Sequence, residues 1–288
     1  MLQVVGVPFT EHQILKAKEA GISEIVLATS FKAELFEPYF GDGGNFGISI
    51  RYAVEEVALG TGGAISNAAQ MLSGDGPVAI FNGDVLSRHD LTGQFDFHEA
   101  KGAEVTLYLT QVEDARAFGA VELDGSKRVT AFNEKMENPP TNIINAGCYI
   151  FNREVIETIP FGKVVSVERE TFPELLAKGA KVFGFIDTSY WLDIGTPTAL
   201  LKASRDLVFG TNKDFLALAG STIALDATIS GGSVIGRRVK IGAGVEINGS
   251  VIGDGAEIGA GAKLTDCFVA PNFEVPAHMI SNGNFFGF

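Results

Sequence analysis

The sequence has few cysteines, few basic residues and no long apolar run. Its two cysteines, Cys148 and Cys267, lie far apart and make no disulfide framework, so a reduced, cytoplasmic protein is expected. No stretch approaches the roughly 18 apolar residues of a membrane span, and no secretory signal pattern opens the chain. Lys and Arg total 22 against 35 Asp and Glu, a formal net charge of −13. This acidity disfavours partners such as nucleic acid or an anionic membrane.

The 288 residues allow one large domain or two of moderate size. Up to about Val208, apolar runs alternate with helical patterns. Strands are expected at 25–28, 78–81 and 105–109, and helices at 11–20, 64–71 and 97–100. This alternation is typical of an α/β domain with a mixed, mostly parallel sheet that helices cover on both faces. Residues 119–123 and 129–133 alternate in polarity and are expected to add antiparallel strands at one side.

After Asp214 the pattern changes to a six-residue repeat, and many of the 35 glycines gather there. An aliphatic residue recurs every six positions, slips by one after Ile247, and then continues; the series is Ile223, Ile229, Ile235, Ile241, Ile247, Ile252, Ile258 and Leu264. This spacing predicts a β-helix of hexapeptide repeats, with one inward aliphatic per short strand and small residues at the corners. Eight repeats at three strands per coil predict slightly under three coils. The apolar tail 282–288 is expected either to pack on the β-helix, as a hydrophobic plug or packing strip, or to contact another subunit.

Three stretches of the first domain suggest ligand chemistry. Leu59-Gly60-Thr61-Gly62-Gly63-Ala64 opens a helix, where exposed amides suit a nucleotide, although a plain tight turn is the commoner use of such a sequence. Phe81-Asn82-Gly83-Asp84 ends a strand, where Asp84 is either a Mg²⁺ ligand or a cap of the next segment. Trp191-Leu192-Asp193 precedes Gly-Thr-Pro, and Asp193 is either a second metal ligand or a helix N-cap.

Two further stretches carry less information alone. Phe132-Asn133-Glu134-Lys135 places a charge pair at a strand end, which is equally consistent with a solvated ion pair. Asn145-Ala146-Gly147 is a polar turn before a buried strand. The four histidines are scattered, show no spacing of a zinc site or catalytic triad, and receive no catalytic role.

Taken together and in this order, the five motifs followed by hexapeptide repeats resemble the sugar-1-phosphate nucleotidyltransferase family, and within it the mannose-1-phosphate guanylyltransferases. The resemblance covers essentially the whole chain. It implies an N-terminally truncated Rossmann-like domain (1–214) followed by a left-handed β-helix (215–288). The oligomeric state stays open, and a homo-oligomer through the β-helix is one alternative. The implied reaction transfers a nucleoside monophosphate from an NTP to a sugar 1-phosphate and releases pyrophosphate. Overall likeness favours GTP and mannose 1-phosphate, and UTP or dTTP with glucose or another hexose are the alternatives.

The resemblance also implies roles for individual residues. Asp84 and Asp193 would hold Mg²⁺, the implied cofactor. Gly60, Thr61 and Gly62, with Asn82 and Gly83, would bind the nucleotide. Lys135 would meet the sugar phosphate, and Glu134, Asn145 and Gly147 would line the sugar pocket. Asp84, Asp193 and Lys135 are therefore the expected catalytic residues.

The sequence departs from the family pattern at its start. Family members open with a strand and a GxGTRLRP loop followed by Lys-Pro, whereas this chain opens with Met1-Leu2-Gln3-Val4, which matches the stretch after Lys-Pro. Either Met1 is an internal methionine with the true start upstream, or the chain is a truncated relative that does not catalyse. The first strand of the family is interior to the sheet, so its absence favours the internal methionine and predicts low stability and little activity for these 288 residues alone. A catalytically silent regulatory homologue, which binds an NDP-sugar or an active paralogue, is the alternative function. A hexapeptide acyltransferase is disfavoured because His278 lies beyond the regular repeats.

Overall fold

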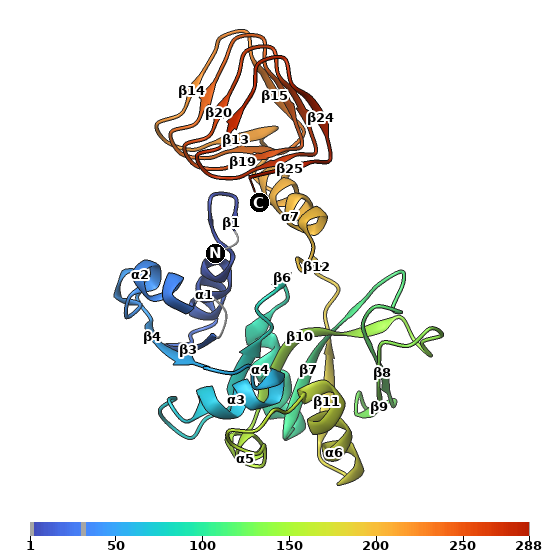
Figure 1. Cartoon of the computed structure of the whole chain (residues 1–288). Coiled ribbons are helices and arrows are strands. Elements are labelled where there is room, and N and C mark those ends of the chain that lie inside the picture. The colour runs from blue at the N-terminus through green and yellow to red at the C-terminus, as the bar shows by residue number, and fades with distance from the viewer. Residues whose placement is uncertain (1–2, 30–32, 288) are drawn as a thin grey trace. The chain divides into compact units, whose positions relative to one another are not determined.

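The computed structural model describes residues 3–29 and 33–287 (Figure 1). Met1 and Phe288 lie outside the described residues, so the expectations attached to them stay predictions. The chain divides into two compact units. One contains His12–Trp191, and the other contains Met1–Glu11 together with Leu192–Phe288. No helix among the described residues is long and apolar enough to cross a membrane.

The unit His12–Trp191 alternates strands and helices, as the sequence predicts. Its α-helices are α1 (Phe9–Glu19, which begins in the other unit), α2 (Glu37–Phe40), α3 (Gly60–Ala69), α4 (Leu91–Lys101), α5 (Arg153–Glu157) and α6 (Phe172–Ala177). Short helical turns occupy Ala33–Leu35, Gly44–Phe46 and Val167–Thr171. Its strands are β3 (Glu24–Thr29), β4 (Ser49–Val54), β5 (Val78–Phe81), β6 (Val85–Ser87), β7 (Val105–Gln111), β8 (Gly119–Leu123), β9 (Val129–Glu134), β10 (Ile143–Phe151) and β11 (Val182–Ile186), and β12 (Trp191–Asp193) crosses into the other unit.

The main sheet of this unit is mixed, as expected. Its path is β11-β7-β10-β8-β9, and β5 also pairs with β10. Strands β5, β7, β8 and β11 share one direction, because β10 is antiparallel to the first three and β11 is parallel to β7. Most pairings are nevertheless antiparallel, since β10 runs against its three neighbours. The expectation of a mostly parallel sheet therefore holds for strand direction but is wrong for strand pairing.

Helices cover both faces of this sheet, which confirms the expected layering. Adjacent residues of β7 point to opposite sides. Leu107 packs in a core that includes Val155 of α5 and Phe172 of α6. Tyr108 packs on the other side with Leu91 of α4. The apolar character of both residues follows from this double covering.

Strands β3 and β4 form a separate two-stranded parallel sheet. It packs against a small core built from Ile14, Phe40, Ile48 and Ile50. Among the described residues, β3 pairs only with β4, and β5 pairs only with β10. Each of the two strands therefore has one edge without a ladder partner, and their apolar side chains are mostly only half-buried.

The other unit is dominated by the β-helix, whose three walls are seen end-on in Figure 1. One wall stacks β13 (Phe215–Ala217), β16 (Ser233–Ile235), β19 (Val251–Ile252), β22 (Phe268–Val269) and β25 (Phe285–Phe286). The second stacks β14 (Thr222–Ile223), β17 (Lys240–Ile241), β20 (Glu257–Ile258) and β23 (Glu274–Val275). The third stacks β15 (Thr228–Ser230), β18 (Glu246–Asn248), β21 (Lys263–Thr265) and β24 (Ile280–Asn282). Within each wall the neighbouring strands run parallel, which confirms the predicted hexapeptide β-helix.

The β-helix is longer than the expected number of coils, because strands also form at both ends of the aliphatic series. The first strand begins at Phe215, and the last contains Phe285 and Phe286. Val275 occupies the inward position after the series ends, and Phe286 also packs against the β-helix core, while Phe285 stays partly exposed. The tail thus contributes a strand to the final coil, as the packing alternative predicted.

The one-residue slip in the series has a structural counterpart. Ile229 pairs with Ile247, eighteen positions later, whereas Ile235 pairs with Ile252, seventeen positions later. Every later pairing also spans seventeen positions, so each coil after the first is shorter by a residue and the inward side chains stay aligned. The same unit also holds the hairpin of β1 (Gln3–Val4) and β2 (Val7–Pro8) and helix α7 (Pro197–Phe209). Arg237 of the β-helix donates to the carbonyl oxygen of Gly6 in this hairpin at 2.9 Å.

Candidate functional site

The end of β5 meets the middle of β10, and this brings two of the expected motifs together. The backbone N–H of Asn82 donates to the carbonyl oxygen of Gly147 at 2.8 Å. Gly147 has a φ of +75°, and a Cβ added there would lie 2.9 Å from Val85 and 3.1 Å from Asn82. Only glycine fits both this backbone conformation and this close approach.

A bulge in β10 shapes the same region. The register between β10 and β7 shifts between Asn145 and Tyr149. The Asn145 amide donates to the Tyr149 hydroxyl at 2.8 Å, and its Oδ1 accepts from the N–H of Gly147 at 3.3 Å. Burial raises the pKa of Tyr149, so its phenol stays neutral. Asn145 and Gly147 are thus held in one conformation beside Asn82.

Glu134 and Lys135 lie at the end of β9, next to the start of β8. Glu134 pairs with Gly119, and the N–H of Lys135 donates to the carbonyl oxygen of Phe118 at 3.2 Å. The Lys135 side chain is 62% exposed and lies 4.0 Å from the Glu134 carboxylate. This loose pair leaves the ammonium group accessible to an anion.

Trp191 connects these two places. Its indole Nε1 donates to the carbonyl oxygen of Ala146 at 3.0 Å. Its ring meets the edge of Phe118 with centroids 5.4 Å apart. The structure therefore links Lys135, through Phe118 and Trp191, to the Asn145–Gly147 turn and the end of β5.

The Gly-rich turn lies at the start of α3, as predicted, but much of it is used internally. The N–H groups of Gly62 and Gly63 both point to the carbonyl oxygen of Val165, at 2.8 and 3.3 Å. A Cβ on Gly60 would lie 2.6 Å from the same oxygen. The Thr61 hydroxyl donates to Glu168 at 2.8 Å and accepts from the N–H of Val167 at 2.9 Å. The expectation that these amides are uncovered is wrong for Gly62 and Gly63, because the 163–168 segment covers them.

The two carboxylates expected to bind metal each follow a strand. Asp84 follows β5, beside the exposed Gly83, and is itself exposed. Asp193 ends β12 in the other unit, and its Oδ1 accepts from the N–H of Gly195 at 2.8 Å. Neither acts as a helix cap: Asp90 caps α4 by accepting from Gly93, and Thr196 caps α7 by accepting from Ala199. The capping alternative for Asp193 is therefore wrong.

The donor chemistry of these two residues suits Mg²⁺. Both are carboxylates, which are hard oxygen ligands, and both retain solvent access. Within residues 3–29 and 33–287 there is no group of three or more His, Cys, Asp or Glu side chains that could hold a metal ion. A Mg²⁺ ion on either carboxylate would complete its shell with water and substrate phosphates, as Mg²⁺ commonly does.

A polar network that the sequence did not point to lies beside the Asn82–Asp84 segment. It joins Gln13 and Lys16 of α1 to Ser87 and His89. Burial lowers the pKa of Lys16 to about 8. Burial, with the nearby Lys16 ammonium, lowers the pKa of His89 to about 3. Lys16 and His89 are 73 positions apart, so no local spacing could have revealed them.

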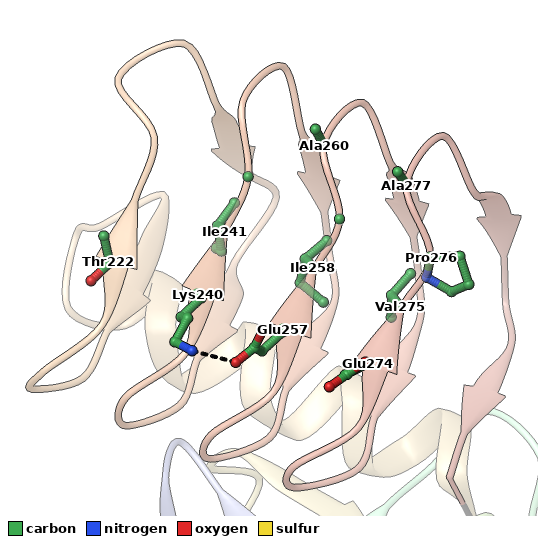
Figure 2. Close-up of a pocket in the computed structure, with 12 residues that line it drawn as sticks. Thr222, Lys240, Ile241, Glu257, Ile258, Ala260, Glu274, Val275, Pro276 and Ala277 are labelled. Carbon is green, nitrogen blue, oxygen red and sulfur yellow. Dashed lines mark hydrogen bonds and ion pairs between the residues drawn. The ribbon is translucent and has the colours of Figure 1, made fainter.

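A shallow depression on one wall of the β-helix is a separate feature (Figure 2). Its polar residues recur at the same position in successive coils: Thr222, Lys240, Glu257 and Glu274. Lys240 and Glu257 form an ion pair across neighbouring coils. The expected site residues lie outside this depression, and the stacking of the coils accounts for it.

Comparisons with known proteins agree with this arrangement. Residues 1–208 match the family model described as nucleotidyl transferase, and residues 232–266 match bacterial transferase hexapeptide (six repeats). The mannose-1-phosphate guanylyltransferase of Mycobacterium tuberculosis is 47% identical over 258 residues, which cover 86% of this chain and 72% of that protein. The D-glycero-alpha-D-manno-heptose 1-phosphate guanylyltransferase of Aneurinibacillus thermoaerophilus is 36% identical and is covered to 88% of its length, over 72% of this chain.

One further relative and one solved structure extend the comparison. The mannose-1-phosphate guanyltransferase of Pichia angusta is 32% identical over 76% of this chain, and the chain spans 63% of that protein. The crystal structure of HddC from Yersinia pseudotuberculosis complexed with GMP-PN has a TM-score of 0.61 and 26% identity, covering 72% of this chain and 88% of that one. The fold, the order of the motifs and these similarities agree: the chain belongs to the nucleotidyl transferase family and is similar to its mannose-1-phosphate guanylyltransferases.

Proposed function

We propose that the protein transfers a GMP unit from GTP to mannose 1-phosphate, giving GDP-mannose and pyrophosphate. The observation that carries the proposal is the meeting of β5 and β10. It gathers Asn82, Asn145 and Gly147 at one place, and Trp191 connects that place to Lys135. The similarity to guanylyltransferases of mannose and heptose 1-phosphates supports guanine and a manno-configured sugar.

In this reaction a phosphate oxygen of the sugar 1-phosphate attacks the α-phosphorus of GTP in line, and pyrophosphate leaves. Neither a covalent intermediate nor an activated nucleophile is needed, which fits the burial of both cysteines as free thiols. Positioning and charge neutralisation supply the rate enhancement.

The residues divide this work by their chemistry. The exposed Lys135 ammonium neutralises the sugar phosphate, and the half-buried Glu134 accepts hydrogen bonds from sugar hydroxyls. Asn145 and Gly147 border the sugar, while Asn82, Gly83, Gly60, Thr61 and Gly62 border the nucleotide. Asp84 and Asp193 would hold Mg²⁺, which neutralises phosphate charge when bound. We further propose that the enzyme is cytoplasmic. We also propose that it assembles through its β-helix, because Phe285 and Ile280 are exposed there.

Pyrophosphate release from GTP, mannose 1-phosphate and Mg²⁺ tests the proposal, with product identified as GDP-mannose. We expect turnover that EDTA abolishes and that excess Mg²⁺ restores. UTP with glucose 1-phosphate, assayed in parallel, tests the base and the sugar. Tight binding of GDP-mannose without turnover would instead identify a regulatory homologue.

A further inference from the structure

Helix α1 reaches the segment that carries Asp84 through two side chains, Gln13 and Lys16. We infer that Gln13 and Lys16 are positioning residues that clamp residues 82–87 and thereby fix Asp84 for metal binding. This inference rests on the proposed function, because it gives Asp84 its role there. Neither residue belongs to the motifs that identify the family.

Gln13 spans the turn that contains Asp84. Its Nε2 donates to the carbonyl oxygen of Asn82 at 2.7 Å and to that of Val85 at 3.3 Å. These two carbonyls flank Gly83 and Asp84 on either side. One amide group therefore ties the entry of the turn to its exit and limits how far the Asp84 backbone can move.

Lys16 holds the far end of the same segment. Its Nζ donates to the Ser87 carbonyl oxygen at 3.0 Å and to the Ser87 hydroxyl at 3.1 Å, and it lies 2.8 Å from His89 Nδ1. An ammonium group has three hydrogens, so these three contacts use its full donor capacity. Asp187, Asp90, Glu19 and Cys148 are the ionisable groups that, besides His89, surround this ammonium.

The contacts of His89 fix its protonation state and anchor the clamp to the sheet. Because the Lys16 ammonium can only donate, His89 Nδ1 must accept, and Nε2 must carry the hydrogen. Nε2 then donates to Gln94 Oε1 at 3.1 Å, and Gln94 Nε2 donates to the Thr106 carbonyl oxygen of β7 at 3.2 Å. The imidazole also stacks on Tyr108, with ring centroids 3.8 Å apart. The clamp therefore starts on α1 and ends on a central strand.

Hydrogen–deuterium exchange of the full chain reports on this clamp without requiring activity. The variants are Gln13→Leu and Lys16→Met. Lys18→Met is the control, since Lys18 lies on the same helix but donates to the Phe46 carbonyl oxygen at 2.6 Å. We expect amides 82–89 to exchange about fivefold to tenfold faster in the two clamp variants and at the unaltered rate in Lys18→Met. Unchanged exchange of these amides in both clamp variants would overturn the inference.

Mg²⁺ dependence of pyrophosphate release separates positioning from general stability. In Gln13→Leu we expect the Mg²⁺ concentration for half-maximal rate to rise about tenfold, with the KM for mannose 1-phosphate unchanged. Lys16→Arg should recover much of the Mg²⁺ response that Lys16→Met loses, because a guanidinium also donates to the Ser87 carbonyl oxygen. An equal change in the KM for the sugar phosphate would contradict a specific effect on Asp84. If the unaltered chain releases no pyrophosphate, the proposed function fails while the exchange result still decides on the clamp.

Discussion

Asn82 donates its backbone N–H to the carbonyl oxygen of Gly147 at 2.8 Å, which fixes the end of β5 against the bulge in β10. Two segments that are more than sixty residues apart in sequence thus form one polar surface. The first prediction follows from the glycine at this contact.

Replacing Gly147 with alanine should destabilise the protein and abolish most activity. The left-handed backbone costs an alanine about 1–2 kcal/mol, and the new Cβ would lie 2.9 Å from Val85 and 3.1 Å from Asn82. Gly179→Ala is the matched control, since Gly179 has a φ of +74° with no atom within 4 Å of an added Cβ. Denaturant unfolding and pyrophosphate release should show a larger stability loss for Gly147→Ala and an activity loss confined to it. Equal effects of the two variants would contradict a site role for Gly147.

Neutralising either proposed metal ligand should remove activity while the fold is retained. Asp84→Asn and Asp193→Asn keep the side-chain shape but remove the charge, and we expect the rate at fixed Mg²⁺ to fall about 100-fold or more. Asp75→Asn changes an exposed carboxylate outside the site and serves as the control. A variant of Asp84 that keeps its rate within threefold would exclude it as a metal ligand.

Lys135→Met should raise the KM for mannose 1-phosphate, since a charge-assisted contact to the phosphate is lost. The expected loss in kcat/KM is about tenfold to 100-fold, with the KM for GTP nearly constant. Lys178, which directly follows α6 and pairs with Glu174 at 3.3 Å, provides the control Lys178→Met. The role of Lys135 is refuted if both variants behave alike in steady-state kinetics.

His89 should make stability depend on pH. Its folded-state pKa of about 3 lies below the ordinary 6.5, so the unfolded chain takes up the proton first as pH falls. The free energy of unfolding contributed by this group is therefore complete above pH 6.5 and declines below it, by up to about 1.4 kcal/mol per pH unit. Denaturant titrations between pH 7 and pH 4 should show a shallower decline for His89→Gln than for the unaltered chain. Parallel curves would show that His89 is not held neutral.

Two isoleucines of the β-helix differ in burial, which allows a test of which side chains point inward. Ile252 is 1% exposed in the β-helix core, and Ile280 is 75% exposed. Ile252→Ala should cost about 2–5 kcal/mol of unfolding free energy, and Ile280→Ala should change it by less than about 0.5 kcal/mol. Thermal unfolding followed by circular dichroism measures both. A similar loss at the two positions would contradict the assigned inward register.

The β-helix could be predicted from sequence because its contacts are periodic. Each inward aliphatic stacks on the equivalent residue one coil later, as Ile241 does on Ile258. A fixed spacing of aliphatic residues in the sequence is therefore enough to predict the fold. The ends were harder to predict, because Val275 and Phe286 continue the inward positions after the regular series stops.

The α/β unit shows where sequence reasoning fails. Strand ends could be located, but the covering of Gly62 by Val165 depends on a segment about a hundred residues later. The Lys16–His89 contact likewise joins two residues with no shared motif. Such contacts are determined by the packing of whole elements, which no local pattern records.

The open edges of β3 and β5 have a practical consequence for work with this protein. Among the described residues each strand has a ladder partner on one side only, and half-buried apolar side chains such as Ile25 and Ile80 line these strands. Backbone groups along such an edge can pair with a strand of another molecule, which is the route to edge-to-edge aggregation. A strand that pairs with either edge would therefore also cover these half-buried side chains.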